Sequence, residues 1–178
     1  MNLPNSLTLL RIFLVPVFVV VLVLHIPYGD LLAAIIFVAA ALTDSLDGYL
    51  ARKYKQVTKL GIILDPIADK LLITAALICL VELGRLQGWI AIVILGREFA
   101  VSGLRAVRAE EGIIIPASKL GKFKTISQIV AVIIIILESL YPPLHIIGVW
   151  AIYIALAITV ISGLDYFMKF RSSEDQNQ

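Results

Sequence analysis

Four aspartates stand at regular spacing in an otherwise apolar chain, at Asp44, Asp47, Asp65 and Asp69. Within each pair the spacing is i,i+3 or i,i+4, which puts both side chains on one face of a helix. A short loop joins the two helical stretches, so the pairs can face each other. Hard oxygen ligands suit Mg²⁺ or Mn²⁺, and two such ions could stabilise both the attacking and the leaving oxygen of a displacement at phosphorus. The pattern therefore predicts a two-ion site at which a phosphorylated substrate reacts.

A purely structural role is the alternative for these carboxylates. Asp44 or Asp69 could form an ion pair with Lys70 or Arg52. However, four facing carboxylates with few cations nearby would repel one another strongly in a medium of low dielectric constant. A bound metal removes that repulsion, so the metal site is the favoured interpretation.

Small residues accompany the aspartates. Gly48 and Ala51 continue the helix face that begins with Asp44, and Gly61 precedes Asp65 by one turn. Small side chains let helix backbones approach closely, and here they would also leave room for a bulky nucleotide. For each of them taken singly, ordinary helix packing is the simpler explanation.

The composition indicates that these helices lie in a membrane. Of the 178 residues, 60% are hydrophobic and 16% are charged, and the mean hydropathy is +0.98. A soluble domain is usually about 45–50% apolar and about 25% charged. We therefore expect an all-α integral membrane protein, with one membrane domain over residues 1–171 and a polar tail over residues 172–178. The lone cysteine, Cys79, excludes an intrachain disulfide.

Turn residues divide the apolar sequence into six expected transmembrane helices. A span needs about 20 apolar residues, so six of them use most of the chain. A short interfacial segment over residues 2–7 would lead into the first helix, and a polar connector over residues 107–119 would follow the fourth. The expected helices cover residues 8–24, 31–50, 62–83, 89–106, 123–140 and 146–167.

Lysine and arginine are distributed unequally between the two ends of these helices. The loops at one end contain a single such cation, Arg85, whereas the other end carries the stretches Arg52–Lys59 and Arg105–Lys124. Short cytoplasmic segments of membrane proteins are enriched in Lys and Arg. The pattern predicts a multi-pass protein of the cell membrane, with both termini and all four aspartates on the cytoplasmic side.

The aspartates and their neighbours together resemble a known signature. The chain is similar to the CDP-alcohol phosphatidyltransferase family, whose eight signature positions are all matched by Asp44-x-x-Asp47-Gly48-x-x-Ala51-Arg52, eight residues, and Gly61-x-x-x-Asp65-x-x-x-Asp69. Other segments resemble in particular the bacterial branch that makes phosphatidylglycerophosphate. These segments are Pro4-Asn5-x-x-Thr8-x-x-Arg11, Gly96-Arg97-Glu98-Phe99 and the run from Leu104-Arg105 to Gly121-Lys122-Phe123-Lys124-Thr125.

The resemblance implies a fold and a reaction. Family members have six helices, form homodimers and contain a polar cavity open to the cytoplasm. There an acceptor hydroxyl attacks the lipid-bearing phosphate of a CDP-linked lipid, and CMP leaves. By this resemblance the four aspartates hold the metals, and Asp69 is also the general base. The residues implied beside the nucleotide or its diphosphate are Asn5, Thr8, Gly48, Ala51, Arg52 and Gly61.

A phosphorylated acceptor would bring its own negative charge into the cavity, so cations are needed there. Arg97 lies midway along the fourth expected helix, where an arginine is costly and usually functional. An ion pair with Glu98 is the alternative, but adjacent helix positions point about 100° apart, so we expect this pair to be poorly placed. With support from the resemblance, Arg97, Arg105 and Lys122 are predicted to bind the acceptor phosphate.

Three other cations are expected only to face anionic lipid headgroups. They are Arg108, Lys119 and Lys124.

The predicted reaction transfers the phosphatidyl group of CDP-diacylglycerol to sn-glycerol 3-phosphate, giving phosphatidylglycerophosphate and CMP. The same chemistry with another acceptor, such as inositol phosphate, is the near alternative. An aspartate-lined cation transporter is the alternative from another class, disfavoured because all four carboxylates lie at one end. An aspartate-rich prenyltransferase does not suit the glycine, alanine and arginine framework. The expected partners are the two substrates, membrane lipid and a second copy of the chain, with no nucleic acid polymer.

Overall fold

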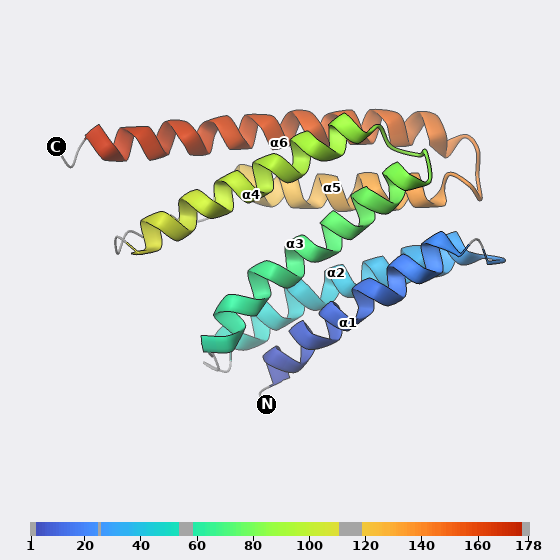
Figure 1. Ribbon diagram of the computed structural model, residues 1–178, viewed down its shortest axis with the longest axis horizontal. Coiled ribbons are helices and arrows are strands. Elements are labelled where there is room, and N and C mark those ends of the chain that lie inside the picture. The colour runs from blue at the N-terminus through green and yellow to red at the C-terminus, as the bar shows by residue number, and fades with distance from the viewer. Residues whose placement is uncertain (1–2, 25, 54–58, 111–118, 176–178) are drawn as a thin grey trace.

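The structure, a computed structural model, describes residues 3–24, 26–53, 59–110 and 119–175 (Figure 1). It has six helices over this part of the chain, which confirms the predicted all-helical class. They are α1 (Leu3–Val23), α2 (Gly29–Lys53), α3 (Lys59–Glu82), α4 (Gly88–Glu110), α5 (Lys119–Leu137) and α6 (Leu144–Asp175). The backbone alone is described at residues 3–4, 44–53, 59–60, 62–63, 110, 119, 169 and 171–175.

Some helices extend beyond their expected limits. Because α1 begins at Leu3, most of the expected interfacial segment is continuous with the first helix. α4 continues to Glu110 and α6 to Asp175, so the start of the expected connector and the start of the expected tail are helical. Hydropathy marks where apolar residues stop, whereas a helix ends where its terminal backbone groups find other partners.

Three short turns connect the helices in pairs at one end of the molecule, the right-hand end in Figure 1. The turn after α3 has Schellman geometry, in which the N–H of Gly84 donates to the carbonyl of Val81 at 3.0 Å and the N–H of Arg85 donates to that of Leu80 at 2.9 Å. Gly84 has a φ of 70°, which glycine adopts at little cost because it lacks a Cβ. Both termini lie toward the opposite end.

An ion pair joins the three turns. Nη2 of Arg85 lies 3.0 Å from Oδ2 of Asp30 at the start of α2. Nη1 of Arg85 donates to the carbonyl of Ile136 near the end of α5 at 3.3 Å, and the hydroxyl of Ser139 donates to the same Asp30 oxygen. We call this end of the molecule the clasped end. Arg85, the lone cation of these loops, therefore has structural partners at the start of α2 and near the end of α5.

The helices form two groups that meet at the clasped end. α1 packs against α2 and α3, whereas α6 packs against α4 and α5. Two helices of the first group contact the second group: α2 packs against α5, and α3 contacts both α4 and α5. In Figure 1 the α1–α2 pair and the α4–α6 group diverge toward the end where the termini lie. The candidate site residues belong to this diverging end.

Large apolar side chains occupy both the centre and the outside of the bundle. Phe18 and Phe37 are fully buried, and their ring centroids lie 5.6 Å apart. On the outside, Ile92, Trp150 and Met168 are each at least 65% exposed. Such a surface fits a protein surrounded by lipid, because large apolar patches are rare on soluble monomers.

Three of the described stretches are long and apolar enough to cross a membrane. They are Asn5–Val23, Leu120–Leu137 and Leu144–Met168. α2 contributes a shorter apolar stretch, Gly29–Thr43, within the described residues. α3 and α4 carry charged residues of the candidate site, among them Asp65, Asp69 and Arg97.

Candidate active site

Two of the four aspartates have described side chains, and both belong to α3. The hydroxyl of Thr8 on α1 donates to Oδ1 of Asp65 at 2.7 Å. Thr8 is only 1% exposed, so water competes little for this bond, and hydrogen bonds to an ionised carboxylate are stronger than neutral ones. Thr8 therefore holds one Asp65 oxygen in a defined orientation. Asp69, one turn further along α3, lines the pocket described below.

A buried polar stripe on α1 contains Thr8. Asn5, Thr8 and Arg11 recur every three residues and are 8%, 1% and 0% exposed. Nε of Arg11 donates to Oγ1 of Thr43 at 3.4 Å, and Thr43 immediately precedes Asp44. Burying an arginine is costly unless polar or anionic groups surround it. The complete burial of Arg11 was not predicted from the sequence. The regular spacing of Asn5, Thr8 and Arg11 on one helix face was the feature that could have indicated it.

The part of α2 that carries the other predicted ligands is described by its backbone alone. Five predicted site residues lie there in the last turns of the helix: Asp44, Asp47, Gly48, Ala51 and Arg52. Gly61, on α3, is buried. Among the side chains that the structure does describe, no group of three or more acidic, histidine or cysteine residues is placed to hold a metal. The four-carboxylate site therefore stays a prediction.

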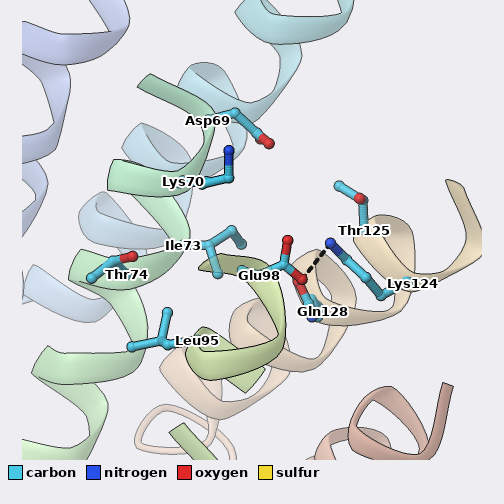
Figure 2. Close-up of a pocket in the computed structure, with 9 residues that line it drawn as sticks. All are labelled: Asp69, Lys70, Ile73, Thr74, Leu95, Glu98, Lys124, Thr125 and Gln128. Atoms are coloured by element: carbon cyan, nitrogen blue, oxygen red, sulfur yellow. Dashed lines mark ion pairs between the residues drawn. The ribbon is translucent and has the colours of Figure 1, made fainter. Parts of the chain in front are cut away.

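A pocket lies between α3, α4 and α5. Figure 2 shows Asp69 and Lys70 of α3 on one side of it, with Glu98 of α4 and Lys124 of α5 on the other. Its empty space is about 290 Å³, open solvent included, so it is a small polar hollow between the helices rather than an enclosed ligand cavity. The lining residues are Asp69, Lys70, Ile73, Thr74, Leu95, Glu98, Lys124, Thr125 and Gln128.

Glu98 joins two cations at the wall of this pocket. Nζ of Lys124 lies 2.5 Å from Oε1 of Glu98, the contact dashed in Figure 2. The same oxygen lies 3.4 Å from Nη1 of Arg97. The expectation that Arg97 and Glu98 are poorly placed for pairing is wrong, because their long side chains bridge the angle between adjacent helix positions. Two cations share one carboxylate oxygen, which leaves net positive charge for an anionic ligand.

Two cations expected to face lipid headgroups are buried instead. Lys124 is 7% exposed and lines the pocket. Arg108 is 5% exposed, and its Nη2 donates to the carbonyl of Phe170 at 3.2 Å. The expectation was wrong for both, since a long basic side chain near a helix end can extend to the headgroups or fold into the bundle. The side chain of Lys119 lies outside the described part of the structure.

Two of the predicted acceptor cations contact α6. Nη2 of Arg97 donates to Oγ of Ser162 at 2.8 Å. The guanidinium of Arg105 lies 5.3 Å from the ring centroid of Tyr166, and Arg105 itself is exposed. Both residues therefore line one seam, between α4 and α6.

The third predicted acceptor cation, Lys122, is exposed in the first turn of α5. Neither it nor the two arginines is among the residues that line the pocket, but Arg97 reaches the pocket wall through Glu98. Lys124, two positions after Lys122, is the α5 cation that lines the pocket. The structure thus places Arg97 and Arg105 along one seam and adds Lys124 beside Glu98, whereas Lys122 belongs to the first turn of α5.

Known proteins of one family match nearly the whole chain. Residues 1–161 match the profile of the CDP-alcohol phosphatidyltransferase family. The chain belongs to this family. It is 44% identical to a CDP-diacylglycerol–glycerol-3-phosphate 3-phosphatidyltransferase from Bacillus subtilis (strain 168), over 94% of each chain. It is 42% identical to a protein of the same name from Rickettsia bellii, over 93% of each. A probable phosphatidylglycerophosphate synthase from Mycobacterium tuberculosis H37Rv is 45% identical over 93% of this chain and 79% of its own.

The family membership allows the carboxylates and cations of the site to be considered together. The carboxylates lie on α2 and α3, whereas most of the buried or clustered cations lie on α4 and α5. Asp69 and Lys124 line one pocket, so a group that can accept a proton and a group that can bind an anion face the same small volume. Neither the transporter nor the prenyltransferase alternative finds support in this family.

Proposed function

We propose that this protein transfers the phosphatidyl group of CDP-diacylglycerol to sn-glycerol 3-phosphate, giving phosphatidylglycerophosphate and CMP. Two relatives that are 42% and 44% identical over at least 93% of both chains carry the name of this activity. The observation in the structure that carries the proposal is the shared pocket of Asp69 and Lys124. A carboxylate and an ammonium group match in charge and chemistry an acceptor with one hydroxyl and one phosphate.

Asp44, Asp47, Asp65 and Asp69 are proposed to hold two Mg²⁺ or Mn²⁺ ions. The donor set fits, because carboxylate oxygens are the ligands that these hard cations prefer. The hydrogen bond from Thr8 fits as well, since metal-binding carboxylates are commonly oriented by a second hydrogen-bonding residue. Bound ions would stabilise the negative charge that develops on the diphosphate as the leaving group departs.

Asp69 is proposed as the general base. It would take the proton of the acceptor hydroxyl as that oxygen forms a bond to the lipid-bearing phosphorus. The bond from the same phosphorus to the CMP oxygen breaks, and CMP leaves with the bonding electron pair. This role requires the carboxylate to lie about 2.6–3.2 Å from the acceptor oxygen, or one water away.

The remaining predicted residues would bind the two substrates. Arg97, Arg105 and Lys122 attract the acceptor phosphate, and Lys124 joins them from inside the pocket. The nucleotide and its diphosphate would lie beside Asn5, Thr8, Gly48, Ala51, Arg52 and Gly61. We propose that the protein is a homodimer in the cell membrane, with its termini and active site on the cytoplasmic side.

The acceptor is tested by measuring CMP release from CDP-diacylglycerol in mixed micelles with Mg²⁺. We expect release with sn-glycerol 3-phosphate and none above background with serine. Inositol phosphate is the informative comparison, since it offers the same phosphate charge on a bulkier alcohol. No release with glycerol 3-phosphate would refute the proposed acceptor. Release with inositol phosphate alone would keep the phosphatidyl transfer and change the acceptor.

Arg105→Ala should mainly weaken binding of the acceptor. The exposed guanidinium can be removed without leaving a buried cavity, and one hydrogen-bonded ionic contact is worth about tenfold in affinity. We expect the apparent KM for glycerol 3-phosphate to rise about tenfold, with a much smaller change in kcat. Arg105→Lys, which keeps the charge, should retain part of the affinity. A defect confined to CDP-diacylglycerol would assign Arg105 to the other substrate.

A further inference from the structure

Three residues with hydroxyl groups and one glycine lie in a line along the buried side of α6. Thr159, Ser162, Gly163 and Tyr166 follow the spacing i, i+3, i+4 and i+7, so they share one helix face. All four are buried, and Thr159 and Ser162 are 0% and 1% exposed. We call these residues the α6 stripe. Polar groups inside a membrane-spanning helix are costly and usually functional, yet nothing in the proposed reaction uses these four.

The first contact of the α6 stripe reaches the pocket directly. Nε2 of Gln128 donates to Oγ1 of Thr159 at 2.9 Å, and both residues are buried. Gln128 lines the pocket that also contains Asp69 and Lys124. The hydroxyl of Thr159 in turn donates to the carbonyl of Ala155 at 2.6 Å, which fixes its direction. Thr159 therefore orients one wall of the pocket.

The second contact acts through Arg97. Oγ of Ser162 accepts from its Nη2 at 2.8 Å, and the next residue, Gly163, leaves room for the arginine side chain. A Cβ at Gly163 would lie 3.0 Å from Cγ of Arg97, tighter than about nine in ten real contacts of this kind, and 3.4 Å from its Nε. Because position 163 has no side chain, Arg97 lies close against α6, and a methyl group there would require Arg97 to shift by a few tenths of an ångström.

Arg97 is connected to the pocket through Glu98. Its Nη1 lies 3.4 Å from Oε1 of Glu98, and the same oxygen lies 2.5 Å from Nζ of Lys124. A continuous chain of polar contacts thus runs from Ser162 through Arg97 and Glu98 to Lys124. Displacing Arg97 would weaken its ion pair with Glu98. Glu98 would then hold Lys124 differently, so the ammonium group of Lys124 would change its position in the pocket.

The third contact concerns the outer arginine of the same seam. Tyr166 presents its ring to Arg105, whose guanidinium lies 5.3 Å from the ring centroid. This is within the range of a cation–π interaction. Tyr166 is 5% exposed while Arg105 is exposed, so a fixed ring supports a side chain that would otherwise be mobile. Both predicted acceptor arginines therefore have their supporting contact on α6.

We propose that the α6 stripe is the positioning element of the acceptor site, and that it sets the affinity for a phosphorylated acceptor without touching it. None of the nine residues that line the pocket comes from α6. The stripe nevertheless holds Gln128, Arg97 and, through Arg97, the Glu98–Lys124 pair. This inference rests on the proposed function, because it assumes that these cations bind the acceptor rather than the CDP-lipid.

Two pairs of matched variants test the proposal. Gly163→Ala adds the crowding methyl next to Arg97, whereas Gly148→Ala adds one on the same helix against Ile135, at a comparable 3.2 Å but near the clasped end. Thr159→Val removes the hydroxyl and keeps the shape, whereas Thr159→Ser keeps the hydroxyl. The apparent KM of each substrate, kcat and the melting temperature are measured on the full-length protein in mixed micelles.

We expect Gly163→Ala and Thr159→Val to raise the KM for glycerol 3-phosphate about tenfold and to change the KM for CDP-diacylglycerol less than about twofold. Gly148→Ala and Thr159→Ser should keep both KM values near wild type, even if Gly148→Ala lowers the melting temperature. Equal changes for the two substrates, or no change in either, would overturn the proposal. If Thr159→Val does not fold, the comparison of Gly163→Ala with Gly148→Ala decides alone.

The wild-type protein separates this proposal from the proposed function. A wild-type protein that is inactive with glycerol 3-phosphate refutes the proposed function as well. An active wild type with unaffected variants refutes only the role of α6.

Discussion

Asp69→Asn is expected to lower the rate of CMP release by about 10²–10⁴-fold, the usual contribution of a positioned general base. Asparagine has nearly the same size and can still accept a hydrogen bond, but it cannot take a proton from the acceptor hydroxyl. Because Asp69 lines the small pocket with Lys124, the substitution removes the carboxylate from the volume proposed for the acceptor. Binding of CDP-diacylglycerol should be largely retained, since three other aspartates would still hold the metals.

The measurement compares kcat with the equilibrium binding of CDP-diacylglycerol in the presence of Mg²⁺. Glu82→Gln is the matched control, because it makes the same chemical change on α3 at an exposed position near the clasped end. This control should be as active as the wild type. Intact turnover in Asp69→Asn would rule out the base. Loss of turnover together with loss of CDP-lipid binding would make Asp69 a metal ligand alone.

The helices and the N-terminal part of the site could be predicted because their signals are local. Apolar runs and turn residues define the six helices without knowledge of their packing. The family signature pointed to Asp65, and the separate Pro4–Arg11 segment pointed to Thr8. The hydrogen bond between these two residues connects α1 to α3 at 2.7 Å. Patterns within single short segments, from Pro4 to Arg11 and from Asp44 to Asp69, were sufficient for these predictions.

The burial of the cations could not be predicted, because it depends on partners distant in the sequence. Lys124 is held by Glu98, and Arg97 is held by Ser162, which lies 65 positions later. Thr159 and Ser162 are inconspicuous in the apolar sequence of α6, where a single hydroxyl changes the hydropathy little. Only the packing of α4 and α5 against α6 reveals that these hydroxyls face the site.

Acidic and basic side chains from different helices face the same pocket toward the end where the helices diverge. α3 presents Asp65 and Asp69, whereas α4 and α5 present the chain from Arg97 through Glu98 to Lys124. Such an arrangement would suit a reaction between a metal-bound diphosphate and an anionic acceptor, because Asp69 of α3 and Lys124 of α5 line the same pocket. The ion pair of Arg85 and Asp30 joins the helices at the opposite end, away from the residues that would contact either substrate.

Asp65→Asn should abolish metal-dependent activity, with a loss on the order of a thousandfold, because a metal ligand contributes several kcal/mol of charge stabilisation. Thr8→Val should have a smaller effect of a different kind. It removes only the hydrogen bond that orients Asp65 Oδ1, and the loss of such a supporting bond typically costs about 10–100-fold in metal affinity or activity. We therefore expect Thr8→Val to need about tenfold more Mg²⁺ for half-maximal activity and to regain most of its rate at saturating Mg²⁺.

The Mg²⁺ dependence separates a metal ligand from a residue that only stabilises the fold. Thr8→Ser keeps the hydroxyl and should show the Mg²⁺ requirement of the wild type, whereas Asp65→Asn should not recover at any Mg²⁺ concentration. If Thr8 served packing alone, Thr8→Val would lower the melting temperature and the amount of active protein, but the Mg²⁺ concentration at half-maximal activity would stay the same. Wild-type turnover in Asp65→Asn would contradict its role as a ligand. Because Thr8 and Asp65 come from different helices, a shifted Mg²⁺ requirement in Thr8→Val would also show that α1 helps to form the metal site.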